Sequence, residues 1–253
     1  MSQGIEAHGL TKSFGDVRAV HDVDLDIDDG ETVTLLGPSG CGKTTILRML
    51  AGLEHPTDGT ITLNGATPAE ARAGKRIGFV PQQPALLPWR TVASNARLLL
   101  DLNRSASPSS PTVSVEELLD EVGLSDFRDA HPHQLSGGMQ QRVGLVRAFA
   151  LDAPVLLMDE PFAALDEITR AEMRHLLGSL RERLGTTVVF VTHSIQEAAF
   201  LSDRVAVMTP RPGTIAQIVD IPLPHPRAPD IEDTPEFFRL TTGLRAALHE
   251  AHA

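Results

Sequence analysis

The chain has 253 residues, of which 42% are hydrophobic and 22% are charged, a composition typical of a globular protein with one large domain or two small ones. The formal net charge of -11 argues against a nucleic-acid-binding protein, which normally presents a basic surface. The single cysteine excludes an intrachain disulfide and fits a reducing cytoplasm. We expect no signal peptide, because residues 1–10 lack a basic start and an apolar run. We also expect no membrane span, because no apolar run approaches the roughly 20 residues that cross a bilayer.

The first third of the chain is predicted to be rich in strands. Residues 22–28 alternate aspartate with Val23, Leu25 and Ile27, which is the pattern of a half-buried antiparallel strand. Residues 32–36 form a short apolar run that ends at a glycine-rich loop, and this pattern predicts a buried strand. We also expect a helix at residues 43–53 and strands at residues 5–14, 60–63 and 76–80.

The character of the sequence changes after Pro88. Helical patterns with no strand between them cover residues 91–102, 115–122 and 136–151. A loop rich in serine and proline at residues 103–112 separates the first two, and we expect it on the surface. The pattern therefore predicts an all-helical insert.

Alternating strands and helices return after the insert. We expect strands at residues 155–158, 187–191 and 205–208 and a helix at residues 167–184. The proline-rich residues 210–229 are expected to wrap the surface, and a helix at residues 235–252 closes the chain. The whole order predicts an α/β protein with a helical insert.

A glycine-rich loop follows the strand expected at residues 32–36 and opens the next helix. It reads Gly37-Pro38-Ser39-Gly40-Cys41-Gly42-Lys43-Thr44, with Thr45 directly after it, and matches the Walker A pattern. In such a loop the backbone amides point at phosphates, Lys43 contacts the β- and γ-phosphates, and the Thr44 hydroxyl binds Mg²⁺. Because a strand and a helix flank the loop, we interpret all nine residues as nucleotide-binding rather than as a chance glycine turn.

Two carboxylates follow the strand expected at residues 155–158. Successive strand residues point to opposite sides, so Asp159 and Glu160 can have different roles. We expect Asp159 to hold Mg²⁺ and Glu160 to polarise the attacking water. Solvated charges at a strand end are the plainer alternative, and the Walker A loop argues against it.

The run Leu135-Ser136-Gly137-Gly138 stands at the start of the helix expected at residues 136–151. Ser136 can cap this helix, and the two glycines allow close approach of a backbone or ligand. The free amides and the helix dipole favour an anion. The run is therefore predicted to be a second phosphate-binding surface.

These three motifs, in this order, closely resemble the ATP-binding cassette (ABC) ATPase family over roughly residues 3–210. The resemblance implies a P-loop NTPase (RecA-like) core with an antiparallel β subdomain and an inserted α-helical subdomain. On this basis we divide the chain into the first part of the core (1–86), the helical subdomain (87–152), the second part of the core (153–210) and a C-terminal tail (211–253).

The resemblance also implies roles for single residues. Phe14 stands where the family stacks an aromatic ring on adenine, and a core phenylalanine is the alternative. Gln82, rather than its neighbour Gln83, matches the glutamine that senses Mg²⁺ and the attacking water. His193 matches the histidine that contacts the γ-phosphate, and residues 164–166 match a loop that meets the partner subunit.

The family resemblance implies ATP and Mg²⁺ as cofactors. It assigns catalysis to Glu160, His193 and Gln82, and Mg²⁺ binding to Thr44, Gln82 and Asp159. It further implies a homodimer, formed on ATP binding, in which each Walker A loop faces Ser136, Gly137 and Gly138 of the other subunit.

Residues 86–92, Leu-Leu-Pro-Trp-Arg-Thr-Val, resemble the nitrate, sulfonate, taurine and pyrimidine-precursor import subfamily, as do residues 210–215 and 224–227. Trp89 fits a contact with an integral membrane permease and core packing equally well. The resemblance implies an ATPase (a translocase) on the cytoplasmic side of the inner membrane. It implies only indirect contact with a periplasmic or extracellular solute-binding protein, and no nucleic acid.

A soluble ABC-type ATPase that acts on nucleic acid or ribosomes is the alternative function. Such proteins usually carry two cassettes or long insertions and are often basic in places. The single cassette, the short insert and the net acidity of this chain argue against it.

Overall fold

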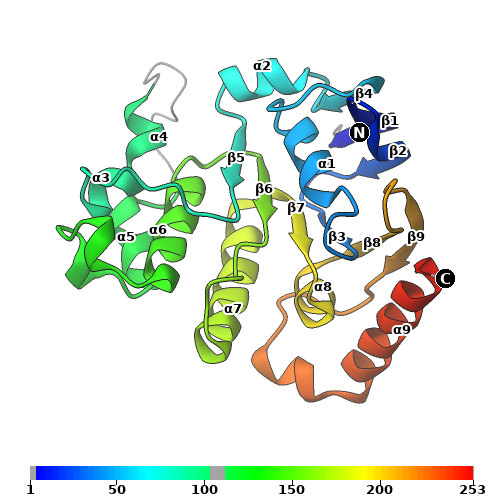
Figure 1. Cartoon of the computed structure of the whole chain (residues 1–253). Coiled ribbons are helices and arrows are strands. Elements are labelled where there is room, and N and C mark those ends of the chain that lie inside the picture. Colours follow the sequence, from blue (N-terminus) through cyan, green and yellow to red (C-terminus); the bar gives the residue numbers. More distant parts are fainter. Residues whose placement is uncertain (1–3, 103–111, 253) are drawn as a thin grey trace.

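The computed structural model describes residues 4–102 and 112–252, arranged as Figure 1 shows. The surface loop predicted at residues 103–112 lies outside the described residues except for Thr112. Within these described ranges, no helix combines the length and the apolar character that crossing a membrane requires.

Among the residues that the structure describes, the N-terminal strands form a three-stranded antiparallel sheet in the order β2-β1-β4. Its members are β1 (Ile5–Phe14), β2 (Val17–Ile27) and β4 (Asp58–Leu63). In β2 the apolar residues Val23, Leu25 and Ile27 are buried, whereas the aspartates between them are exposed. The predicted half-buried strand is confirmed, and it begins earlier than expected, at Val17.

A second sheet, six-stranded within the described residues, has the order β5-β6-β7-β3-β8-β9. The first five strands run parallel, and β9 pairs antiparallel with β8 at the edge. Strands β3, β6 and β7 are buried along their whole length, as expected of parallel strands covered on both faces. The bounds are β3 (Thr32–Leu36), β5 (Ile77–Val80), β6 (Val155–Asp159), β7 (Thr187–Thr192), β8 (Arg204–Met208) and β9 (Ile215–Asp220).

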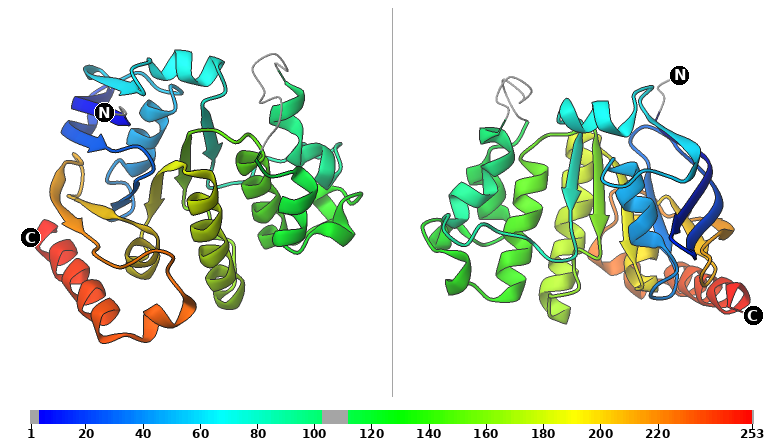
Figure 2. Two further views of the ribbon diagram at one scale, coloured as in Figure 1. Left: turned by 180° about the vertical axis from the view of Figure 1, so that it is seen from behind. Right: turned by 45° about the horizontal axis from the view of Figure 1, so that its top comes forward.

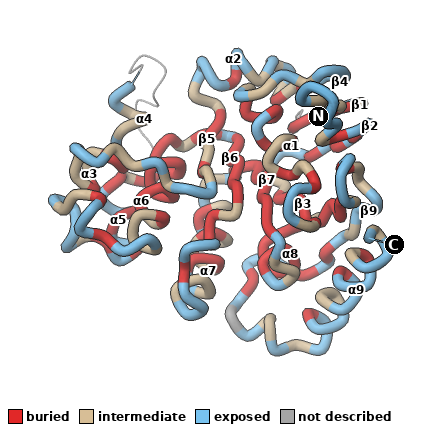
Figure 3. Tube along the Cα trace, in the orientation of Figure 1, coloured by how far each residue is buried: buried red, intermediate tan, exposed pale blue. Residues whose placement is uncertain are grey.

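The six-stranded sheet separates two hydrophobic cores. Figure 2 shows helices on both sides of this sheet, and Figure 3 shows that its central strands are buried. Along β3, Val33 and Leu35 pack with α1 (Lys43–Leu50) and the small sheet, while Leu36 packs into the opposite core. Successive strand residues point to opposite faces, so each buried strand serves both cores. The helices on the second face are α6 (Gly137–Phe149), α7 (Glu167–Leu184), α8 (Ile195–Leu201) and α9 (Pro235–Ala251).

The predicted helical insert forms a lobe beside the six-stranded sheet, at the left of Figure 1. It contains α3 (Val92–Ala96), α4 (Leu98–Asp101), α5 (Val115–Glu121) and α6. The single helix expected at residues 91–102 is wrong, because Arg97 interrupts it between α3 and α4. Hydroxyl groups cap α3, α5 and α6: the side chains of Thr91, Ser114 and Ser136 accept backbone N–H groups in the first turns of these helices.

Three elements differ from the sequence-based expectations. The proline-rich segment does more than wrap the surface, because it contains β9. Residues 215–220 hold no proline, so they can pair with β8 as an edge strand. Helices α2 (Pro68–Ala73) and α8 were not predicted, although capping side chains at Thr67 and Ser194 mark their starts.

The α/β core, the antiparallel β subdomain and the helical lobe are confirmed as the architecture of the chain. The residue boundaries assigned to these parts stay a prediction.

Packing of Phe190 on β7 is expected to be a major contribution to stability. Phe190 is fully buried, and its ring centroid lies 5.8 Å from that of Phe162. Phe190→Ala should lower the free energy of unfolding by about 3–5 kcal/mol, because it removes buried contacts and leaves a cavity. Phe238, with 70% of its surface exposed, is the matched control, and Phe238→Ala should change stability by less than about 0.5 kcal/mol. Urea unfolding of both variants checks the difference.

Candidate functional site

The phosphate loop lies where the parallel strands end. It follows β3 and leads into α1, with Gly42 as the residue before the helix. Gly42 has φ 105°, and an added Cβ would lie 2.8 Å from a methyl group of Val20 and 2.9 Å from the carbonyl oxygen of Ala19. Only glycine fits this position without strain. The small sheet therefore presses on the loop and holds it against the start of α1.

The Lys43 side chain turns back into its own loop. Its Nζ donates hydrogen bonds to the carbonyl oxygens of Gly37, at 2.7 Å, and Pro38, at 2.8 Å. The residue is only 5% exposed, so these bonds satisfy a charge that burial would otherwise penalise. Cys41 is buried as well, and its Sγ lies 3.8 Å from the same Nζ. The ammonium therefore lies inside the loop.

Thr44 and Asp159 join α1 to the end of β6. The Thr44 hydroxyl donates to Asp159 Oδ1 at 2.9 Å. Burial raises the pKa of the Asp159 carboxyl; the bond from Thr44 lowers this pKa, and the charge of Glu160 raises it again. A hydroxyl and a carboxylate are oxygen ligands of the kind that Mg²⁺ prefers, so the donor set fits the predicted cation.

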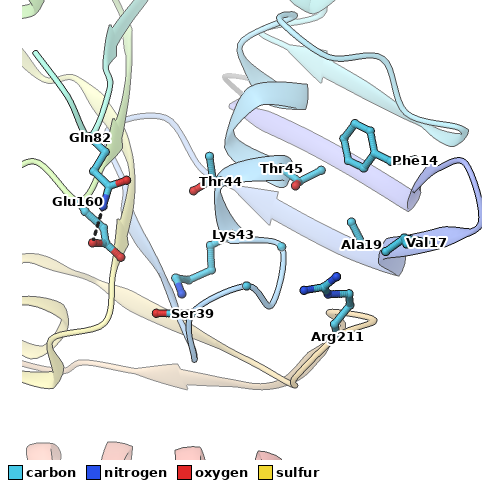
Figure 4. A pocket seen from close by; sticks show the side chains of 12 residues that line it. Phe14, Val17, Ala19, Ser39, Lys43, Thr44, Thr45, Gln82, Glu160 and Arg211 are labelled. Carbon is cyan, nitrogen blue, oxygen red and sulfur yellow. Dashed lines mark hydrogen bonds between the residues drawn. The ribbon is translucent and has the colours of Figure 1, made fainter. Parts of the chain in front are cut away.

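Glu160 connects three strand ends in one hydrogen-bonded group. Its Oε2 accepts from Gln82 Nε2 at 3.3 Å, as Figure 4 shows, and its Oε1 lies 3.2 Å from Nδ1 of His193. Gln82 follows β5, Glu160 follows β6 and His193 follows β7. The Glu160 backbone has φ 45° and donates to the carbonyl oxygen of Val191 at 2.9 Å. Such left-handed backbone at a non-glycine residue is uncommon and occurs preferentially at functional sites.

An open cavity of about 420 Å³ runs from the phosphate loop to the small sheet. Phe14 lies at its far end and is 48% exposed, so Phe14 is not a core residue. Gln82 lines the cavity, and its neighbour Gln83 is absent from the lining. The lining residues are Phe14, Val17, Ala19, Ser39, Gly40, Gly42, Lys43, Thr44, Thr45, Gln82, Glu160 and Arg211.

Some of the predicted nucleotide-binding residues do not line this cavity. Gly37, Pro38 and Cys41 are absent from its lining. Gly37 and Cys41 are buried, and an added Cβ at Gly37 would touch Cys41 Sγ at 3.0 Å. These residues shape the loop from within. Arg211 was missed by the sequence analysis, because only the fold brings the loop between β8 and β9 to the phosphate loop.

The run Leu135-Ser136-Gly137-Gly138 is separate from this cavity. Ser136, Gly137 and Gly138 are absent from its lining. The Ser136 Oγ accepts the Met139 N–H at 3.2 Å and caps α6. An added Cβ at Gly138 would lie 3.1 Å from a methyl group of Leu165, whereas Gly137 has no neighbour within 4 Å among the described residues. Ser136 and Gly137 are exposed, so this helix start faces outward.

Comparison with known sequences decides the family. The family described as ABC transporter matches residues 20–163, which is more than half of the chain. The chain belongs to the ABC transporter family.

Two relatives illustrate how closely this ABC cassette matches known proteins. It is 42% identical over 251 residues to an aliphatic sulfonates import ATP-binding protein of Xanthomonas axonopodis pv. citri (strain 306), covering 99% of this chain and 98% of the relative. It is 45% identical over 208 residues to a taurine import ATP-binding protein of Jannaschia sp. (strain CCS1), covering 82% of this chain and 76% of the relative.

Solved structures agree with this assignment. A dimeric ATP-binding cassette in a post-hydrolysis state, bound to ADP and Pi, matches with a TM-score of 0.75 at 33% identity and covers 86% of this chain and 98% of its own. The ATP-binding subunit of an ABC transporter matches with a TM-score of 0.79 at 24% identity, covers 98% of both chains, and bears on the fold alone. The prediction of an ATP-binding and ATP-hydrolysing cassette is confirmed.

Phe14 offers a test of where this ABC ATPase holds the base. If its ring stacks on adenine, Phe14→Ala should weaken ATP binding by roughly 10- to 100-fold, the usual value of one aromatic–base contact. The free energy of unfolding without nucleotide should hardly change, because the ring is half exposed. Titration with a fluorescent ATP analogue measures the first quantity and urea unfolding the second. Phe14→Trp is the control that should keep binding, and unchanged affinity in Phe14→Ala would place adenine elsewhere.

Proposed function

We propose that this chain is the ATP-hydrolysing subunit of an importer that takes up a small solute of the nitrate, sulfonate, taurine or pyrimidine-precursor type through a separate membrane permease. The observation that carries this proposal is the hydrogen-bonded group of Gln82, Glu160 and His193 beside the phosphate loop. Relatives named as sulfonate and taurine import ATP-binding proteins support the importer class. Nothing among these relatives supports a role on nucleic acid or ribosomes.

Binding of the triphosphate is assigned to the phosphate loop and the start of α1. Backbone N–H groups of the loop residues that line the cavity, Ser39, Gly40 and residues 42–45, attract the phosphates together with the helix dipole. The Lys43 ammonium exchanges its two carbonyl partners for β- and γ-phosphate oxygens. Thr44 and Asp159, with Gln82, would hold Mg²⁺, which neutralises charge on the phosphates when it is bound. The hydrogen bond between Thr44 and Asp159 keeps both oxygen donors on one side of the loop.

Hydrolysis is assigned to Glu160 as the general base. Its carboxylate accepts the proton of the attacking water. Gln82 binds one carboxylate oxygen and His193 lies beside the other, so the two residues fix the direction in which Glu160 presents its charge. His193 has 65% of its side chain exposed and can therefore also meet the γ-phosphate, the contact expected of it.

A homodimer completes the catalytic site in this proposal. Each phosphate loop receives Ser136, Gly137 and Gly138 from the other subunit. The outward position of these residues supports this arrangement, and so does the dimeric state of a similar cassette. ATP lies in the interface, so formation of the dimer depends on how much more tightly the dimer binds ATP than the monomer does.

The permease is proposed to contact residues 86–92. Trp89 is 72% exposed, which rules out the alternative that it packs in the core. Asn95, fully buried beneath this segment, accepts the Leu87 N–H at 2.8 Å and donates to the carbonyl oxygens of Leu87, Arg90 and Thr91. One buried amide thus fixes the loop that displays Trp89. A rigid, exposed aromatic side chain is typical of a binding surface.

This arrangement places the chain on the cytoplasmic side of the cell membrane, bound to integral permease subunits. A periplasmic or extracellular solute-binding protein would deliver the solute to the permease without touching this chain.

Growth of a deletion strain tests the importer function. Strains that lack this chain should fail to grow when one solute among taurine, alkanesulfonates, nitrate and a thiamine precursor is the limiting nutrient. The wild-type gene should restore growth, and a gene with Lys43→Ala should not. Normal growth of the deletion strain on all four nutrients would contradict the proposed class of solute.

Removal of the Glu160 charge should separate binding from hydrolysis. Glu160→Gln keeps hydrogen-bonding capacity toward Gln82 and His193 but cannot take a proton from water. ATP binding should stay within about threefold of wild type, while kcat should fall by more than about 100-fold. Glu167→Gln, the same change at an exposed position of α7, is the control with unchanged hydrolysis. Phosphate release measures kcat, and nucleotide titration measures ATP affinity. A wild-type kcat in Glu160→Gln would show that Glu160 is not the general base.

Ser136→Arg should block dimer formation and leave ATP binding by the monomer intact. The arginine fills the space that the other subunit's nucleotide needs, and it also removes a helix cap that contributes about 1 kcal/mol. Ser114→Arg removes the equivalent cap of α5 in the same lobe and controls for that loss of stability. Sedimentation with ATP and hydrolysis assays should show a defect in Ser136→Arg alone. Loss of ATP binding in the Ser136→Arg monomer would overturn the shared site.

A further inference from the structure

The loop between β8 and β9 brings an arginine to the nucleotide cavity. Arg211 lines this cavity together with the phosphate loop, and Figure 4 shows its guanidinium directed toward that loop. A Cβ added at Gly40 would lie 3.5 Å from Arg211 Nη2. The guanidinium is therefore at the end of the cavity where phosphates are expected, although Arg211 lies far from Walker A in the sequence.

Backbone contacts hold this loop firmly in place. Gly213 donates to the carbonyl oxygen of Ala19 at 3.0 Å and accepts the His21 N–H at 3.0 Å. An added Cβ at Gly213 would come within 1.8 Å of the Cys41 carbonyl oxygen, so the loop is wedged between β2 and the phosphate loop. The hydroxyl groups of Thr209 and Thr214, 3.0 Å apart, close its base. The position of the loop does not depend on the Arg211 side chain.

The Arg211 guanidinium has no hydrogen bond or ion pair with any residue that the structure describes. The chain carries a net charge of -11, so carboxylates are abundant, and none of the described ones neutralises Arg211. The other cation of the cavity, Lys43, is bound by loop carbonyls. Arg211 thus presents a free donor set to the solvent of the cavity.

We propose that Arg211 binds the phosphates of the nucleotide held by its own subunit. This inference rests on the proposed placement of ATP in the cavity. A guanidinium offers paired donors that match phosphate oxygens, and such charge-assisted bonds are among the strong ones. The loop is positioned before the nucleotide arrives, so little ordering is needed on binding. Arg211 acts on nucleotide binding rather than on the chemical step.

Titration of the purified full-length chain with a fluorescent ADP analogue tests this role. Arg211→Ala should weaken ADP binding by about tenfold, and Arg211→Lys should recover part of the loss. The inhibition constant of adenosine, which has no phosphate, should be the same in wild type and Arg211→Ala once displacement is corrected for the affinity of the analogue. In ATP hydrolysis the KM of Arg211→Ala should rise while kcat changes less than about twofold. Arg239→Ala, at an exposed position of α9, is the matched control and should bind ADP like wild type.

Three results would overturn the inference. Wild-type ADP affinity in Arg211→Ala would exclude a phosphate contact. An equal loss for ADP and adenosine would mean that the side chain stacks on the base or supports the cavity. A lower melting temperature of Arg211→Ala without nucleotide, absent from Arg239→Ala, would mean that the arginine is structural. Lys43→Ala separates this inference from the proposed function: lost binding there, with normal binding in Arg211→Ala, leaves the function intact and removes only the role of Arg211.

Discussion

The parallel register of β3, β7 and β6 is the constraint on which the site depends. Leu36 pairs with Thr192, and Asp159 pairs with Val191, so the three strands end almost level. The residues that follow these ends are therefore neighbours: the phosphate loop after Leu36, His193 after Thr192 and Glu160 after Asp159. A shift of one strand by a single residue would reverse the faces of its side chains and disconnect Glu160 from His193.

Hydrogen bonds between the helical lobe and the core connect α6 to the segment that follows Gln82. Arg147, near the end of α6, donates to the carbonyl oxygens of Pro84 and Ala85 at 2.6 and 3.1 Å. Burial lowers the pKa of this guanidinium, yet hydrogen bonds satisfy it. Because Ser136 caps the start of α6, one helix links the residues proposed to meet the other subunit with the segment that follows Gln82. In the proposed dimer, a contact made at Ser136 would therefore be transmitted through α6 to the residues next to Gln82.

The predictability of each part depended on whether its signal was local. Burial could be predicted from two local patterns, the alternation at residues 22–28 and the apolar runs that form β3, β6 and β7. The curvature of the phosphate loop could be predicted from its glycines. The break at Arg97 has no local marker. Strand β9 is short and lies among prolines, so its partner β8 decides its conformation. The approach of Arg211 to Gly40 arises only when β8 lies beside β3, a non-local fact that no motif in the sequence encodes.

The hydrogen bonds of Lys43 affect the free energy with which the phosphate loop binds a nucleotide. The Lys43 ammonium donates hydrogen bonds to the carbonyl oxygens of Gly37 and Pro38 within its own loop. Nucleotide entry is then an exchange reaction, in which internal hydrogen bonds are given up as new ones form. The net gain is smaller than a count of the new contacts suggests.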